Sequence, residues 1–243
     1  MYTAKELEEL MRIIIARGMQ IEPGGIDHKH NEVVPGAPRS PIKLHICTPG
    51  LRKEARLTED DMQQIVYMWW SYIERHRLMV PAIGGVPRVG EKFATMLQLY
   101  VREQTGRRIP IVQTEKIIKA DGTREIGHVI PSKEYPSGDI WLIDDLVNWG
   151  RSKFEAHDRY TQAGYRVTDS LVAVDYGVGA VQLLRDKGVR LHSLLQLDSI
   201  LLFGAQEKLM DMSIISKTKA YLAASRLANT ALPKTGSAVD KTA

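Results

Sequence analysis

Two adjacent carboxylates and a glycine turn form the stretch of the sequence best suited to chemistry. The apolar run Ile140–Ile143 ends on Asp144 and Asp145. A short turn follows, made of Asn148, Trp149, Gly150, Arg151 and Ser152. Free backbone N–H groups at such a turn bind a phosphate, and carboxylates accept hydrogen bonds from sugar hydroxyls. The pattern predicts a phosphosugar site, and paired aspartates that only cap a helix are the alternative.

Two other groups of polar residues have patterns less specific for chemistry. His28 and His30 beside Asp27 suggest a metal site, but no second cluster has ligand spacing, which favours a surface loop. Cys47 lies two residues after His45, and a Cys–His nucleophile would need the two side chains to converge in space. We therefore expect an ordinary thiol at position 47.

The elements that must position the acid pair alternate between strands and helices. Apolar strands are predicted at Leu78–Ile83, Ile109–Val112, Ile140–Ile143, Leu171–Val174 and Leu191–Leu195. Helices are predicted between them at Gly90–Arg102, about Ser152–Ala163 and up to Lys187. This alternation indicates an α/β fold, a parallel sheet covered by helices on both faces. Ligands bind such sheets at the carboxyl ends of the strands, so the loops after Ile83, Ile143 and Val174 should meet at one site.

The flanking segments have other patterns. A helix is predicted over 3–19, with Thr3 and Glu6 in the capping-box relation, and another is predicted to open at Thr58 and Asp61. Between them lies an irregular Pro- and Gly-rich segment with one strand at Ile42–Ile46. A last helix is expected from Ala205 to about Ala228.

The region 114–138 interrupts the alternation. It is polar and carries the turn signal Asp121-Gly122-Thr123, which predicts a β-hairpin or mobile hood. Basic residues run through and before it, at Arg102, Arg107, Arg108, Lys116, Lys119 and Arg124. An anion-binding segment and a solvated loop face are both consistent with this run.

Composition excludes several classes of protein. Hydrophobic residues make up 44% and charged residues 26% of the 243, which is typical of a globular domain. The longest apolar runs fall short of the roughly 18 residues of a membrane span. One cysteine excludes a disulfide framework, and the acidic start is unlike a signal peptide, so a cytoplasmic location is expected. The net charge of +4 suits an anionic small molecule and does not favour a nucleic acid or membrane partner.

The segment 140–152 resembles the phosphoribosyl pyrophosphate motif of type I phosphoribosyltransferases. That motif is an apolar strand, two acids, two apolar residues, two usually small hydroxyl residues, and then Gly with Ser or Thr. The run 163–194 is similar to the C-terminal half of orotate phosphoribosyltransferases. Ser40-Pro41-Ile42 and the run 85–90 fall where that family has its substrate-side Ser-Pro and its pyrophosphate loop. The resemblance covers about residues 7–203.

This resemblance implies a fold and a reaction. We expect N-terminal helices and a substrate-side segment at 1–77, an α/β core at 78–204 with the hood at 114–138, and a C-terminal helix and tail at 205–243. A base nitrogen would displace pyrophosphate from C1 of the activated ribose, with Mg²⁺ on the pyrophosphate and ribose hydroxyls. In this orotate-type reaction of pyrimidine nucleotide synthesis, catalysis comes from positioning and from neutralising the leaving group. The resemblance also implies a homodimer.

Residue by residue, the resemblance assigns roles. Asp144 and Asp145 would face the ribose hydroxyls, so replacing both with Asn is expected to lower transfer by orders of magnitude and leave the fold intact. Lys116 and Lys119 match the hood bases that reach the pyrophosphate. The pyrophosphate loop matches Arg88, Val89 and Gly90. The 5′-phosphate loop matches Asn148, Trp149, Gly150, Arg151 and Ser152.

Five positions depart from the family pattern. Glu115 and Tyr176 stand where the family usually has arginine, and Ala120 stands where it has aspartate. Trp149 replaces a small hydroxyl residue, so its ring either moves aside or narrows the pocket. Pro35 stands where many orotate enzymes have a lysine near the substrate. These departures favour two alternatives: a transferase for another base, and a non-catalytic ligand sensor or interaction subunit with the same fold.

Overall fold

A parallel sheet of four strands forms the middle of the structure, in the order β3–β6–β7–β8. The computed structural model describes residues 2–26, 39–118 and 124–231. The strands are β3 (Ile83–Gly85), β6 (Gly138–Val147), β7 (Tyr165–Asp175) and β8 (Arg190–Gln196). All neighbouring pairs are parallel, and β6 and β7 are buried along most of their length because helices cover both faces.

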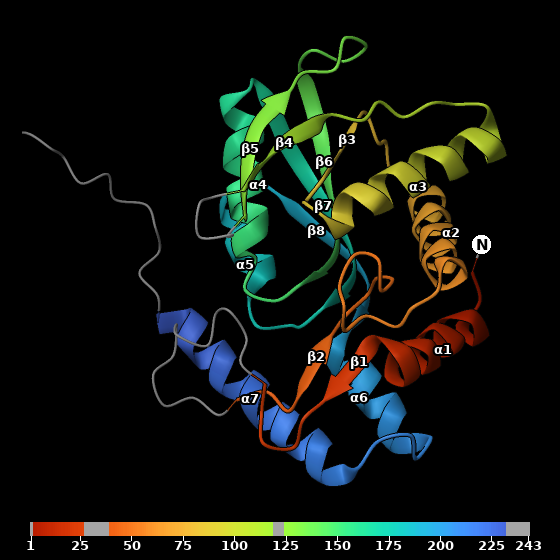
Figure 1. Cartoon of the computed structure of the whole chain (residues 1–243), viewed down its shortest axis with the longest axis vertical. Coiled ribbons are helices and arrows are strands. Elements are labelled where there is room, and N and C mark those ends of the chain that lie inside the picture. Colours follow the sequence, from red (N-terminus) through yellow and green to blue (C-terminus); the bar gives the residue numbers. More distant parts are fainter. Residues whose placement is uncertain (1, 27–38, 119–123, 232–243) are drawn as a thin grey trace, which may run out of the picture.

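Helices cover the sheet on both sides (Figure 1). One face is covered by α2 (Glu59–Arg75) and α3 (Val89–Thr105), and the other by α4 (Arg151–Gln162) and α5 (Ala180–Asp186). The Trp69 ring of α2 meets the Phe93 ring of α3 at 4.8 Å between centroids, and its indole N–H donates to the Val172 carbonyl at 3.1 Å. The α/β architecture predicted from the alternation is therefore confirmed.

The N-terminal segment follows the predicted pattern. Helix α1 (Ala4–Ile13) begins with the Thr3–Glu6 capping box and continues into the π-helical turn η1 (Ile14–Gly18). Strands β1 (Met19–Ile21) and β2 (Ile42–Leu44) then pair antiparallel. Thr58 and Asp61, which were predicted to open a helix, form a second capping box at the start of α2. Each box satisfies backbone N–H groups that have no partner within the helix.

The region 114–138 contains the predicted hairpin. Strands β4 (Gln113–Ile118) and β5 (Arg124–Ile130) pair antiparallel. The backbone N–H of Ile126 donates to the Glu155 carboxylate at 3.1 Å, which ties β5 to helix α4. The hairpin thus stands beside the sheet as a separate two-stranded unit.

Two predicted strands are wrong in extent. The strand expected at Leu78–Ile83 is Ile83–Gly85, and the one expected at Ile109–Val112 makes only a bridge between Ile83 and Ile111. Ile83 donates to the Pro110 carbonyl, and the Val112 N–H donates to Ile83, both at 2.9 Å. Pro110 has no N–H to donate, so the ladder does not extend and the sheet has four strands rather than five.

The helix predicted over 205–228 is present, but its predicted start is wrong. The chain forms α6 (Leu197–Gln206) and α7 (Met212–Ala231), separated by a turn in which Lys208 has φ 56°. Asp211 accepts the Ser213 N–H at 2.7 Å, as an N-terminal cap does. None of the helices within the described ranges combines the length and the apolar character of a bilayer span.

Candidate active site

The loops that follow β3, β6 and β7 meet at the carboxyl end of the sheet, as predicted. The Val86 N–H donates to the Ile143 carbonyl, and the Tyr176 N–H donates to the Val147 carbonyl, both at 2.9 Å. A Cβ at Gly90 would collide with the Ile143 carbonyl oxygen, so only glycine lets α3 begin this close to β6. These contacts bring the pyrophosphate-loop residues next to the acid pair.

The two acids of β6 point in opposite directions. The strand runs on to Val147 rather than ending at Ile143, so Asp144 and Asp145 lie within it and face opposite sides of the sheet. Both are buried, with 6% and 2% of their surface exposed. The Asp145 N–H donates to Oδ1 of Asp144 at 3.0 Å. The pair therefore has two different surroundings.

Asp144 is neutralised by a lysine that our sequence analysis missed. Nζ of Lys153 lies 2.5 Å from Oδ2 of Asp144 and 2.6 Å from the Leu146 carbonyl oxygen. Lys153 is 1% exposed. Its spacing from Ala156 and Tyr160, two other buried residues of α4, is the sequence signal that would have identified it as inward-facing.

One oxygen of Asp145 has no hydrogen bond among the described residues. Oδ1 accepts the Leu146 N–H at 2.9 Å, whereas the buried Oδ2 has no hydrogen bond among the described residues. An Arg52 guanidinium nitrogen lies 3.7 Å from Oδ2. Burial, followed by the Asp144 carboxylate, raises the pKa of Asp145 to about 7, while Arg52 and Lys153 oppose the rise. Arg52 lies between β2 and α2, where the sequence carries no signal for it.

The predicted phosphate loop joins β6 to α4. Gly150 has φ +78° and precedes α4, whose start no side chain in the described segments caps. Arg151 and Ser152 are exposed there. Oδ1 of Asn148 is buried and unbonded within the described part of the chain. An uncapped helix start with free backbone N–H groups is suited to binding an anion.

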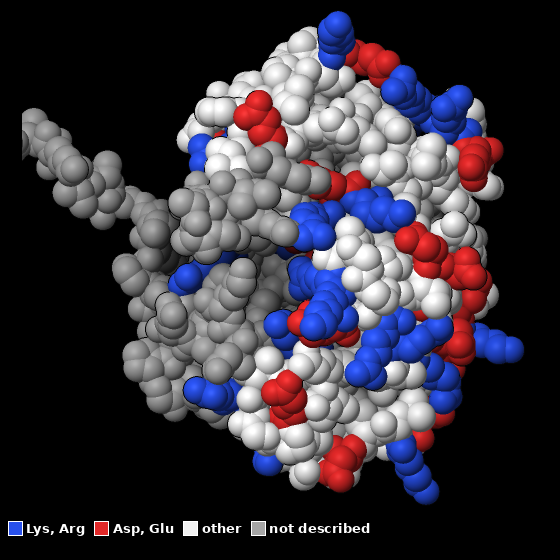
Figure 2. All heavy atoms as spheres, viewed as in Figure 1, with Lys and Arg blue, Asp and Glu red and all other residues white. Residues whose placement is uncertain are grey.

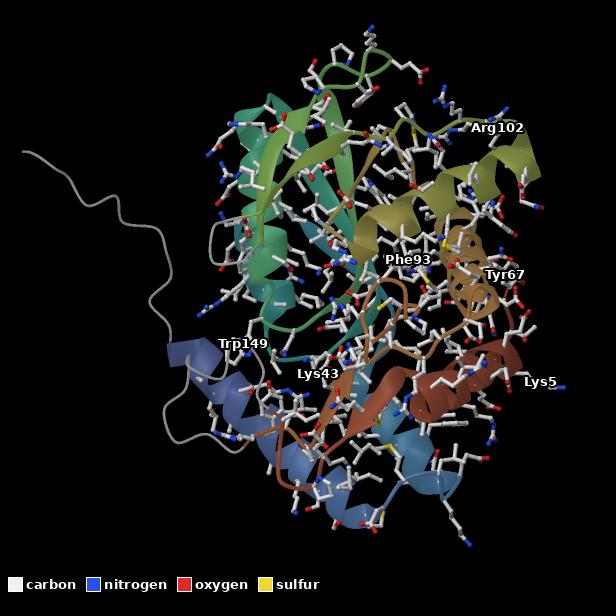
Figure 3. All side chains as sticks on the ribbon, viewed as in Figure 1. Lys5, Lys43, Tyr67, Phe93, Arg102 and Trp149 are labelled. Atoms are coloured by element: carbon white, nitrogen blue, oxygen red, sulfur yellow. The ribbon has the colours of Figure 1, made fainter. Side chains whose placement is uncertain are left out.

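Two of the departures from the family pattern have structural roles. Trp149 is 6% exposed and packs in the main core, at the lower end of the α/β part beside α7 in Figure 3. Its ring has thus moved into the core, the first of the two predicted outcomes. The Tyr176 hydroxyl accepts the Leu44 N–H at 3.0 Å, which joins the end of β7 to β2.

A cavity of about 500 Å³ lies between α3 and the base of the hairpin. Arg88 and Lys92, with the carboxylate of Glu91 between them, line it from one side, and Gln113 and Thr114 line it from the other. Val89 and Gly90 begin α3 beside it. Figure 2 shows Lys and Arg side chains gathered across the middle of this face, over the segment between β2 and α2 and the start of α3. Such a cavity suits a polyanion.

The hood residues are only partly described. Glu115 is exposed on β4, opposite Gly127 of β5. The backbone of Lys116 belongs to β4, whereas Lys119 and Ala120 fall outside the described residues, as do Asp27, His28, His30 and Pro35. The predicted roles of Lys116 and Lys119 therefore stay predictions.

The remaining candidates do not converge on a metal or nucleophile site. Cys47 is fully buried, and burial, followed by the Asp145 charge, raises the pKa of its thiol to about 12, which keeps it protonated. His45 is bonded to Gln20 at 2.9 Å. Within residues 2–26, 39–118 and 124–231, no three or more His, Cys, Asp or Glu side chains are grouped to hold a metal.

A larger cavity, of about 790 Å³, opens at the opposite edge of the sheet. Trp141, Asp169 and Arg190 line it, and Asp169 is already paired with Arg190 at 2.9 Å and with His192 at 2.8 Å. Ligands of parallel sheets bind at the carboxyl ends of the strands, so the acid pair and not this cavity marks the candidate site.

Comparisons with known proteins agree with the resemblance seen in the sequence. No protein-family model matches the chain. The chain is 26% identical over 161 residues to uridine 5′-monophosphate synthase of Bos taurus, covering 66% of this chain and 32% of that protein. It is 31% identical over 120 residues to an orotate phosphoribosyltransferase of Methanopyrus kandleri, covering 49% and 57%. The chain thus spans about a third of the bovine protein and somewhat over half of the archaeal one.

The fold has the same relatives. The structure of Leishmania donovani UMP synthase superposes with a TM-score of 0.65 at 20% identity, over 89% of this chain and 42% of that one. The expected type I phosphoribosyltransferase fold and the resemblance to orotate phosphoribosyltransferases are therefore confirmed.

Proposed function

We propose that this chain transfers the 5-phosphoribosyl group of phosphoribosyl pyrophosphate to a nucleobase, in an orotate-type reaction. The observation that carries the proposal is the buried Oδ2 of Asp145, which has no hydrogen bond among the described residues, at the carboxyl end of β6. The candidate phosphate loop joins this end of β6 to the start of α4, which has no side-chain cap in the described segments. A ribose 5-phosphate needs these two features together, a hydroxyl acceptor and an anion site. Homology to orotate phosphoribosyltransferases supports the same activity.

Three parts of the site divide the substrate between them in this proposal. Asp145 accepts a ribose hydroxyl, and the turn from Asn148 to Ser152 binds the 5′-phosphate. The cavity beside Arg88 and Lys92 receives the pyrophosphate. The transition state at C1 is oxocarbenium-like, so the chain acts by holding the sugar in line with the base and by neutralising the leaving group.

Mg²⁺ belongs to the substrate in this proposal. Both oxygens of Asp144 are engaged, by the Asp145 N–H and by Lys153, which leaves one free carboxylate oxygen on the pair. Mg²⁺ requires six oxygen ligands in near-octahedral geometry. The acid pair does not fit a resident metal, so Mg²⁺ would arrive on the pyrophosphate oxygens. We further propose a cytoplasmic homodimer.

Release of pyrophosphate tests the activity and identifies the base. We expect the chain, incubated with phosphoribosyl pyrophosphate, Mg²⁺ and a panel of pyrimidine and purine bases including orotate, to release pyrophosphate with at least one of them. A nucleotide product should form in equal amount, measured by chromatography. If phosphoribosyl pyrophosphate binds and no base in the panel supports the release of pyrophosphate, the proposed activity is wrong.

A non-catalytic ligand sensor or interaction subunit is the second candidate. Glu115 favours it, because this exposed carboxylate stands on the hairpin where the family has a positive charge. Neutralisation of Asp144 by Lys153 also favours it, since one of the two acids is then occupied. Binding of phosphoribosyl pyrophosphate without turnover would support this candidate over the first.

Reversing the charge of Glu115 should tighten ligand binding. Glu115→Arg removes a negative charge near the incoming pyrophosphate and adds a positive one, which should lower the Kd for Mg²⁺–phosphoribosyl pyrophosphate about fivefold at low ionic strength. Calorimetry measures the change, and added salt should reduce it. Glu103→Arg, an exposed site at the far end of α3, makes the same change in net charge and should leave the Kd unaltered. Equal effects of the two substitutions would remove the hairpin from the binding site.

A further inference from the structure

Lys153 is buried at a place in the fold that disfavours a cation. It is the third residue of α4, in the first turn, where the helix dipole is positive. Its side chain is 1% exposed, so water does not solvate the ammonium group. A lysine buried in this way either loses its proton or is held by an anionic partner. Its partners therefore decide what it does.

Both oxygens of Asp144 have partners, and Lys153 is one of them. Nζ donates to Oδ2 of Asp144 at 2.5 Å, and Oδ1 of Asp144 accepts the Asp145 N–H at 3.0 Å. Nζ also donates to the Leu146 carbonyl at 2.6 Å. Because Lys153 lies on α4 and its acceptors lie on β6, these bonds close the loop between the strand and the helix. That loop is the candidate phosphate loop.

Asp145, in contrast to Asp144, has a partner among the described residues on only one of its two oxygens within hydrogen-bond distance. Oδ1 accepts a backbone N–H, and Oδ2 is buried without a hydrogen bond in the described segments. Arg52 approaches it to 3.7 Å from the other side of the sheet. Two carboxylates therefore lie between two cations, and Oδ2 of Asp145 is the one oxygen of the pair without a hydrogen bond among the described residues.

We propose that Lys153 is the built-in counter-ion of the acid pair. It withdraws Asp144 from ligand binding, holds the phosphate loop against β6 and leaves Asp145 as the one carboxyl that meets a ligand. It is a positioning residue, since it acts through Asp144. A divalent cation prefers several oxygen ligands and is repelled by the ammonium group, so it gains little from this pair. This role does not depend on the transfer activity.

Binding of Mn²⁺ in the absence of any substrate tests the proposal. Electron paramagnetic resonance counts free Mn²⁺ in the presence of the protein. We expect Lys153→Met to bind Mn²⁺ at least tenfold more tightly than the unaltered chain, and Lys153→Met with Asp145→Asn to lose that gain. Lys153→Arg keeps the charge and should behave as the unaltered chain does. Lys187→Met, which breaks the partly exposed pair with Asp158, should gain nothing.

Two results would overturn the proposal. One is Mn²⁺ binding by the unaltered chain that matches Lys153→Met and disappears in Asp145→Asn. The other is a folded Lys153→Met chain with no gain in Mn²⁺ affinity. If Lys153→Met does not fold, Lys153→Gln carries the same test, because its amide still donates hydrogen bonds but has no charge.

Discussion

Replacing Asp145 with asparagine should lower the rate of pyrophosphate release by about 100- to 1,000-fold, the usual effect of deleting one charge-assisted contact at a reacting centre. Oδ2 of Asp145 is the free carboxylate oxygen of the acid pair, and an amide is a weaker acceptor for a ribose hydroxyl than a carboxylate. The fold should survive, because the buried Oδ2 has no hydrogen bond among the described residues and its nearest cation, Arg52, lies 3.7 Å away. Steady-state kinetics and thermal unfolding measure both effects.

The pH profile separates this role from a merely structural one. With the pKa of Asp145 raised to about 7, the carboxyl ionises as the pH rises through neutrality, so kcat/KM should increase there. The same shift means that the folded chain holds this proton more tightly than the unfolded chain. The contribution of Asp145 to the free energy of unfolding is therefore complete below pH 4 and is lost as the pH rises to about 7. Asp145→Asn should lack this rise in kcat/KM, and its stability should fall less between pH 4 and 7 than that of the unaltered chain.

A matched substitution lies on the same strand. Asp139→Asn removes an exposed carboxylate at the opposite end of β6, paired with Arg166 at 2.6 Å. Its effect on the rate should be within about twofold, because surface ion pairs contribute little. Similar rates for Asp145→Asn and Asp139→Asn would place the ribose elsewhere.

Local signals in the sequence were sufficient to predict the elements that surround the candidate site. Apolar runs predicted the parallel sheet, capping residues predicted the starts of α1 and α2, and the glycine turn predicted the uncapped start of α4. These features depend on residues close together in the chain. The loops meet at one edge because parallel strands share their carboxyl ends, which is a general property of the fold.

Long-range contacts determined what the sequence did not predict. Arg52 reaches Asp145 from a loop far away in the chain, and Tyr176 joins β7 to β2 through the Leu44 N–H. The Trp149 ring packs in the core, a choice that the sequence left open. Pro110 ended a strand whose apolar residues otherwise fit the sheet. Each of these outcomes depends on a partner that no local pattern identifies.

The spacing of Asp144 and Asp145 in the sequence was not enough to predict their different surroundings. The family resemblance gives the two adjacent aspartates the same role, facing the ribose hydroxyls. Alternation along β6 puts them on opposite faces, so one meets α4 and the other meets the N-terminal segment. Asp144 is consequently bonded to Lys153, whereas Oδ2 of Asp145 has no hydrogen bond among the described residues.

Asp144→Asn should therefore lower the free energy of unfolding by about 3 kcal/mol, the lower end of the cost of breaking a buried ion pair by removing one partner. Lys153 would be left buried with a charge that Asp145 compensates only in part. Asp144→Asn with Lys153→Met removes both charges and should recover most of the loss, since replacing a whole buried pair is often neutral. Asp158→Asn, at the partly exposed pair with Lys187, should cost less than about 1 kcal/mol. Urea unfolding at constant pH gives the free energy of unfolding of the unaltered chain and of the three variants. If Asp144→Asn lowers this free energy no more than Asp158→Asn does, Asp144 does not support the fold.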